Sequence, residues 1–144
     1  MRQAYLNLIE KQREELNNFP IAYAFSKEQL KEALEKLGAK NVTECCTYSN
    51  MGDIMKKEDA PRYKEMLERH TDELRTAMMN EDFAEAAFLY EMDNHEYAIN
   101  WDGDADVLSS LCMNKKILKE LGLENAYKRA RRQHMINAQE WGVI

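Results

Sequence analysis

The chain has 144 residues, of which 44% are hydrophobic and 32% charged, and its formal net charge is -6. This length fits one domain that folds without disulfide or metal staples, and the apolar content excludes a disordered acidic segment. No apolar run approaches the roughly 18 residues of a membrane span, and the N-terminal stretch is too charged for a secretory signal. We therefore expect a cytoplasmic protein with no membrane partner and with three reduced cysteines.

The N-terminal part predicts helix, strand and helix in turn. A helical apolar face begins near Tyr5, and residues 21–25 alternate large and small side chains, which is typical of a short strand. Ser26 and Gln29 then form a capping-box pattern, in which the serine accepts from an early N–H and Gln29 reaches back. Gly38 is expected to close this helix as its C-terminal cap.

The middle of the chain predicts a hairpin followed by a long helix. Residues 42–48 are rich enough in β-branched and aromatic side chains for a strand, and residues 49–52 supply turn chemistry. Residues 53–57 are expected to return as the second arm of the hairpin. Pro61 suits the first turn of a helix that continues to about Asn80.

The C-terminal part predicts only helices. One helix runs from Asp82 toward residues 94–97, and Asp104 or Asp106 can cap a short helix that follows. Asn114 can cap another short helix ending near residue 122.

Together these elements predict one α+β domain over residues 1–144. It should be mostly helical, with about six helices and a small antiparallel sheet of about three strands. No internal repeat or low-complexity linker divides the sequence. The last helix, at about residues 124–139, is basic.

Charge is distributed unevenly along the chain. Residues 115–144 hold seven Lys or Arg against three acids (+4), which leaves 13 against 23 (-10) in residues 1–114. An acidic body repels nucleic acid and attracts basic protein surfaces. The basic end can dock on the protein's own acidic face, bind phosphates or bind an acidic protein. Its basic patch consists of Lys128, Arg129, Arg131 and Arg132.

A metal-dependent enzyme centred on His95 is one alternative. Glu91 and His95 have the spacing of two ligands on one helix face, and Glu96 and Asp102 can add oxygens. The other interpretation of His95 is a buried, hydrogen-bonded side chain that fixes a helix end. No second His or Cys has partner spacing, and the common hydrolase, nucleotide and zinc signatures are absent. We therefore expect neither catalysis nor a cofactor.

Several short blocks carry a family resemblance. The sequence Asn-His-Glu-Tyr-Ala-Ile at residues 94–99, followed by Trp101-Asp102, resembles a family of small acidic proteins of uncharacterised activity carried on mobile genetic elements and phages of gut bacteria. Upstream blocks, including Phe19-Pro20 and Leu37-Gly38, extend the resemblance over roughly the first four fifths of the chain. The basic C-terminal helix departs from it.

The resemblance implies a mobile-element or phage context and favours a counter-defence role, such as that of an anti-CRISPR or antirestriction inhibitor. A small acidic protein of this kind binds a basic, nucleic-acid-processing or defence protein through its acidic surface. Tyr97 and Trp101 would be aromatic anchors if exposed. The expected acidic surface lies along the third and fourth helices and consists of Glu68, Asp72, Glu73, Glu81, Asp82 and Glu85. Direct nucleic-acid binding through the basic patch is the second alternative, and the oligomeric state stays open.

Overall fold

The computed structural model describes residues 1–95 and 103–142, and these residues form two compact units. Unit 1 comprises Met1–Lys11 and Thr71–Ile144, and unit 2 comprises Gln12–His70. The expectation of one domain over the whole chain stays a prediction.

The α+β, mostly helical fold class is confirmed. The described residues form seven α-helices, where the sequence predicts about six, and three short strands. The helices are α1 (Arg2–Asn17), α2 (Lys27–Leu37), α3 (Ala60–Met78), α4 (Glu81–Asn94), α5 (Gly103–Ser110), α6 (Lys115–Glu120) and α7 (Glu124–Glu140). The strands are β1 (Ala22–Tyr23), β2 (Cys45–Cys46) and β3 (Asp53–Lys56). None of the helices in the described residues combines the length and apolarity needed to cross a bilayer.

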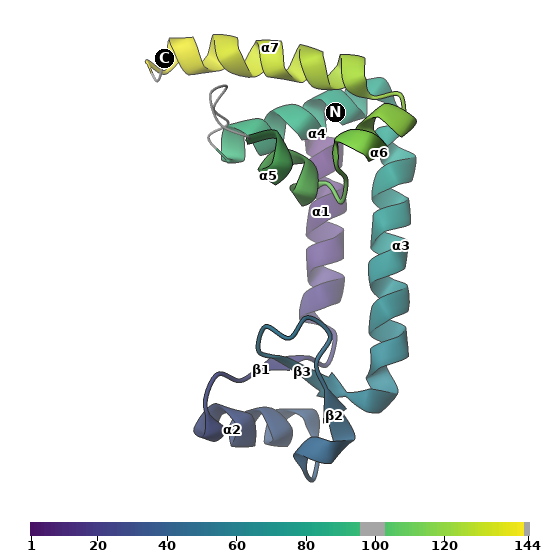
Figure 1. The fold of residues 1–144 in the computed structure, drawn as a ribbon, viewed down its shortest axis with the longest axis vertical. Coiled ribbons are helices and arrows are strands. Elements are labelled where there is room, and N and C mark those ends of the chain that lie inside the picture. Colours follow the sequence, from purple (N-terminus) through teal and green to yellow (C-terminus); the bar gives the residue numbers. More distant parts are fainter. Residues whose placement is uncertain (96–102, 143–144) are drawn as a thin grey trace. The chain divides into compact units, whose positions relative to one another are not determined.

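Unit 2 contains the sheet, in which β3 lies between β1 and β2 and pairs antiparallel with both. Tyr23 of β1 lies opposite Asp53, and helix α2 packs against β1 and β3 (Figure 1). The predicted strand over residues 42–48 is wrong in its first part, because Val42–Glu44 form a 3₁₀ helix, η1. Asn41 accepts a hydrogen bond from the Thr43 N–H at 3.0 Å and so caps this helix before pairing begins.

The start of α2 differs from an ideal capping box by one residue. Ser26 Oγ accepts from the Gln29 N–H at 3.2 Å, as expected. Gln29 Oε1, however, accepts from the N–H of Phe25 at 2.8 Å, which ties the end of β1 to the first turn of the helix. Gly38 closes α2 with a φ of 69°, the left-handed conformation that glycine adopts without a steric penalty.

Unit 1 is built around the pair of helices α4 and α7, with α5 also packed against α4 (Figure 1). Small buried side chains on both helices, such as Ala87 and Ala130, allow the backbones to approach closely. Tyr5 of α1 and Phe88 of α4 are the largest fully buried side chains of the core around them. The core of unit 1 is therefore formed mainly between helices distant in sequence.

Side-chain caps set the starts of α4 and α6. Asn80 accepts from the Phe83 N–H at 3.1 Å and Asn114 from the Ile117 N–H at 2.9 Å, and the latter cap was predicted. The prediction that Asp104 or Asp106 caps the short helix is wrong. Helix α5 already begins at Gly103, so both carboxylates lie inside its first turn.

Candidate functional site

The predicted acidic surface and the predicted basic patch meet each other in unit 1. Arg129 of α7 lies between two carboxylates of α4, with its Nε 2.9 Å from Glu85 Oε2 and a terminal nitrogen 3.6 Å from Glu81 Oε2. The hydrogen bond with Glu85 raises the pKa of Arg129 above its usual value. For this residue, the basic helix docks on the protein's own acidic face.

Two more of the predicted acids have partners within the chain. Glu73 pairs with Lys11 at 3.4 Å, and Glu68 pairs with Lys64 at 3.9 Å. Asp72 and Asp82 are exposed. Four of the six predicted acids, including Glu81 and Glu85, are thus held in internal ion pairs.

The rest of the basic patch faces solvent. Lys128, Arg131 and Arg132 are exposed and lie three and four residues apart, so they share one face of α7. Within the described part of the chain, their side chains make no hydrogen bond or ion pair. Trp141, at the C-terminal end of the same helix, is 58% exposed.

His95 ends helix α4 and links it to α5. Its Nε2 lies 3.2 Å from Glu91 Oε2 and 2.8 Å from Ser110 Oγ. The interpretation of His95 as a buried side chain is wrong, since the residue is exposed, although it does lie at the end of a helix. Ser110 also donates to the Asp106 carbonyl at 3.0 Å, so its one proton is used there and the His95 ring donates.

This geometry differs from that of a catalytic triad. A triad histidine uses one ring nitrogen for the nucleophile and the other for the acid, whereas one nitrogen of His95 serves both Ser110 and Glu91. Glu91 is buried and already accepts a 2.5 Å hydrogen bond from the Tyr5 hydroxyl. Burial and this bond raise the pKa of Tyr5 well above its usual range.

The metal alternative gains no further ligand from the described residues. In residues 1–95 and 103–142, no third His, Cys, Asp or Glu joins Glu91 and His95 as a metal-binding group. Glu96 and Asp102 lie outside the described residues, as do the predicted anchors Tyr97 and Trp101.

The other two histidines also face carboxylates. His134 Nδ1 lies 2.6 Å from Asp93 and joins α7 to α4, and His70 Nε2 lies 2.9 Å from Glu15. Hydrogen bonds from Arg69 and then His70 lower the pKa of Glu15 to about 2, although desolvation opposes this. These histidines therefore connect helices within their own units.

Unit 2 presents an exposed apolar group that the sequence reasoning missed. Phe25 is 75% exposed and Met51 76%, with Tyr23 at 61% and Tyr48 at 48%. The Phe25 ring lies directly over Gly52, where an added Cβ would be 2.4 Å from Cε1. We call Tyr23, Phe25, Tyr48 and Met51 the aromatic surface.

A single carboxylate organises the loop that carries half of the aromatic surface. Desolvation opposes ionisation of Asp53, yet hydrogen bonds from Ser49, the Tyr48 N–H and Thr47 hold its pKa well below the usual range. Asp53 Oδ2 accepts from the Tyr48 N–H at 2.8 Å, and Oδ1 accepts from the Met51 N–H at 3.4 Å. Hydrogen bonds to one side chain therefore hold the backbone of this loop.

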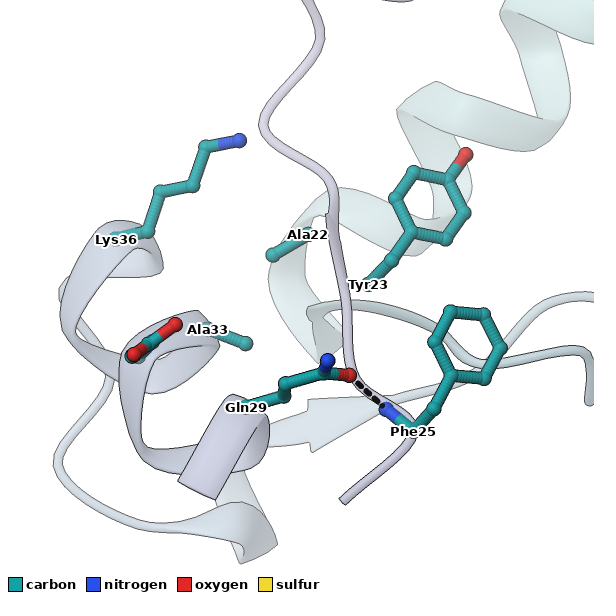
Figure 2. Close-up of a pocket in the computed structure, with 7 residues that line it drawn as sticks. Ala22, Tyr23, Phe25, Gln29, Ala33 and Lys36 are labelled. Atoms are coloured by element: carbon teal, nitrogen blue, oxygen red, sulfur yellow. Dashed lines mark hydrogen bonds between the residues drawn. The ribbon is translucent and has the colours of Figure 1, made fainter. Parts of the chain in front are cut away.

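A groove of about 370 Å³ runs between β1 and α2 (Figure 2). Ala22 and Ala33 are buried and point toward one another at its base, and the hydrogen bond from the Phe25 N–H to Gln29 crosses one end. The rings of Tyr23 and Phe25 lie on the other side of β1 from Lys36. The lining residues are Ala22, Tyr23, Phe25, Gln29, Glu32, Ala33 and Lys36.

One pattern in the sequence signals this site. Residues 22–25 read Ala-Tyr-Ala-Phe, with the two aromatic residues two positions apart and hence on one side of the strand. In a strand that buries its large side chains, the alanines would face solvent. Here Ala22 is buried and Tyr23 is exposed, so the large side chains face solvent.

Comparison with known proteins gives a family. No curated protein and no solved structure matches the chain. A protein-family model matches residues 4–133, which include the aromatic surface, the Glu91–His95 pair and most of α7. The chain belongs to this family, which is described as a family of unknown function (DUF7659).

Proposed function

We propose that the protein acts by binding another protein and is not an enzyme. The observation that carries this proposal is the aromatic surface of unit 2, where four large apolar side chains are between 48% and 76% exposed. Clustered exposed apolar and aromatic side chains are characteristic of protein-binding sites. Since the Asp53 hydrogen bonds hold Tyr48 and Met51 in place, little ordering entropy is lost on binding.

The proposed partner is a basic, nucleic-acid-processing or defence protein. Residues 71–106 hold eleven acids and one arginine, and Asp72 and Asp82 are exposed. Such an acidic excess speeds association with a positively charged protein and makes binding sensitive to salt. The resemblance to proteins of mobile elements and phages supports an inhibitor of the anti-CRISPR or antirestriction kind, acting in the cytoplasm.

Affinity capture from host lysate at low and high salt tests this proposal, with mass spectrometry of the retained proteins. We expect the wild-type chain to retain a basic nucleic-acid-handling protein at low salt. The double variant Tyr23→Ser and Phe25→Ser should lose it, whereas Met79→Ser, a change at a 59% exposed position in unit 1, should retain it. Equal capture by all three proteins would contradict a role for the aromatic surface.

Direct nucleic-acid binding is a second candidate, favoured by the three exposed cations of α7. Lys128, Arg131 and Arg132 share one helix face, and exposed Trp141 could stack on a base. A mobility-shift assay at several salt concentrations tests this function. Binding should disappear on reversing the charges of Arg131 and Arg132, and a shift that survives the reversal would remove this candidate.

A further inference from the structure

We propose that the groove between β1 and α2 binds an extended peptide segment of the protein partner, which adds a strand to β1. This inference rests on the proposed protein-binding function and names the site and the form of the ligand. Addition of a strand to a free sheet edge is a common mode of peptide recognition, in which main-chain hydrogen bonds supply affinity and side-chain pockets supply specificity.

Strand β1 has a free edge with unused backbone groups. It pairs with β3 on one side, where Ala22 faces Ile54 and the Ala24 N–H donates to the Gly52 carbonyl at 2.9 Å. Because the bonding direction alternates along an antiparallel strand, the N–H and C=O of Tyr23 point away from β3. Within the described residues, neither group has a recorded partner.

The groove opens beside this strand, because its lining comes from β1 and α2 and includes no residue of β3. Two buried alanines, Ala22 and Ala33, form its base, where their small side chains let α2 approach β1 closely. The α2 wall runs from Gln29 to Lys36, which is roughly 10 Å at about 1.5 Å per residue. That length matches about three residues of extended chain at roughly 3.3 Å each.

Charges on the α2 wall indicate the side chains of the ligand. Glu32 and Lys36 are exposed, and no ion pair is recorded for either in the part of the chain described. They are separated along the helix by about 6 Å, close to the roughly 6.6 Å between alternate residues of a strand. The peptide should therefore place a basic residue opposite Glu32 and an acidic residue opposite Lys36, and these two peptide residues should be two positions apart.

The residue between these two charges faces the other side of the added strand. There it lies beside the Tyr23 ring, on the same side of β1 as Phe25 (Figure 2). Aromatic and β-branched side chains are the favoured cross-strand neighbours of an aromatic residue. The ligand is thus an extended segment with the pattern basic, apolar, acidic.

Selection of a displayed random heptapeptide library against the full chain tests the proposal. We expect enrichment of the pattern basic, apolar, acidic, read in either strand direction. Selection against the variant Glu32→Lys, which leaves two cations on the α2 wall, should instead enrich peptides with the pattern acidic, apolar, acidic. No enrichment, or the same enriched sequences with both proteins, would overturn the proposal.

Two variants test the groove with an enriched peptide. Tyr23→Pro removes the edge N–H, and Ala33→Trp fills the space between the two walls. Each should weaken peptide binding roughly tenfold or more, the factor expected for the loss of about one hydrogen bond. Lys64→Ala, an exposed change outside the groove, is the control, and circular dichroism checks that all three variants are folded. Unchanged affinity in a folded Ala33→Trp variant would exclude this groove.

Two further results separate this inference from the proposed function. Suppose that Ala33→Trp still captures the partner from lysate while Tyr23→Ser with Phe25→Ser does not. The groove is then not the binding site, and the proposed function stands. If sedimentation shows a dimer that Tyr23→Pro dissociates, a second copy occupies the edge and the peptide proposal is overturned.

Discussion

The Nε of Arg129 lies 2.9 Å from the carboxylate of Glu85, so a residue of the basic patch and a residue of the acidic surface bind each other. Glu81 approaches the same guanidinium at 3.6 Å. The opposite charges of the two parts of the sequence are therefore partly neutralised between α4 and α7. Among the described residues, this leaves Asp72 and Asp82 as the acids of the six without an ion pair, and Lys128, Arg131 and Arg132 as the exposed cations of the patch.

Reversing one charge of this pair should destabilise unit 1, and reversing both should restore most of the loss. Arg129→Glu places a third carboxylate beside Glu81 and Glu85. The loss of unfolding free energy should be small, and smaller still at high salt, because the charged groups are partly exposed and screened by solvent. Urea denaturation of Arg129→Glu, Glu85→Arg and the double variant measures the coupling. Additive effects of the two single changes would show that the pair contributes no stability.

Tyr5→Phe should lower the free energy of unfolding by about 1–3 kcal/mol, because it leaves the buried Glu91 carboxylate without its 2.5 Å donor. Chemical denaturation followed by circular dichroism measures the change. Tyr90→Phe is a matched control, since the Tyr90 ring contacts Tyr5 but no hydrogen bond of its hydroxyl is recorded among the described residues. If Tyr5→Phe lowers the free energy of unfolding no more than Tyr90→Phe does, the structural role of Glu91 is contradicted.

Asp53→Asn should remove a pH-dependent part of the stability of unit 2. The pKa of Asp53 is lowered on folding, so its contribution is present above the unfolded value of about 3.9 and is lost as the pH falls toward the folded value. Between pH 6 and pH 2, the free energy of unfolding should fall less steeply in the variant than in the wild type. The lowered pKa of Glu15 affects both proteins alike, so the difference between the curves reports Asp53.

An identical slope in the two curves would show that Asp53 does not hold the loop. Asp72→Asn, at an exposed position, is the control and should leave stability within about 0.5 kcal/mol of the wild type.

The whole chain should unfold in one transition if residues 1–144 are one domain. Burial and the nearby Glu44 raise the pKa of the Cys45 thiol, so this group in unit 2 should label slowly until it is exposed. In a chain with Cys46→Ser and Cys112→Ser, Cys45 labelling should follow the same urea curve as loss of helical circular dichroism. Labelling at clearly lower urea would show that unit 2 unfolds independently.

Local signals in the sequence predicted most elements correctly. The Ser26 cap, the Gly38 cap and the Asn114 cap each depend on residues within four positions, and all three are present. The predicted strand at residues 42–48 failed at its start because Asn41 offers the backbone a competing hydrogen bond. The Asp caps of α5 failed because helix α5 starts one residue before Asp104. The sequence therefore predicts the type of an element correctly where the contact that decides it joins residues close together in the chain.

The candidate site depends on contacts that no local pattern contains. Tyr5 and Glu91 are 86 positions apart, and Arg129 and Glu85 are 44 apart. The groove exists because α2 lies beside β1, and the periodicity of neither element reveals that contact. The pairing of Glu91 with His95 was predicted, since residues four apart meet on any helix, but its hydrogen bonds to other elements were not.

The ring of Phe25 occupies the space that a side chain at position 52 would need, and Gly52 has a φ of 88°. These two positions are therefore expected to vary together among relatives in the family. A φ of 88° strains any residue that has a side chain, so members that keep Phe25 should also keep glycine at position 52. An alignment of the family can therefore show whether the residues at these two positions are linked across its members.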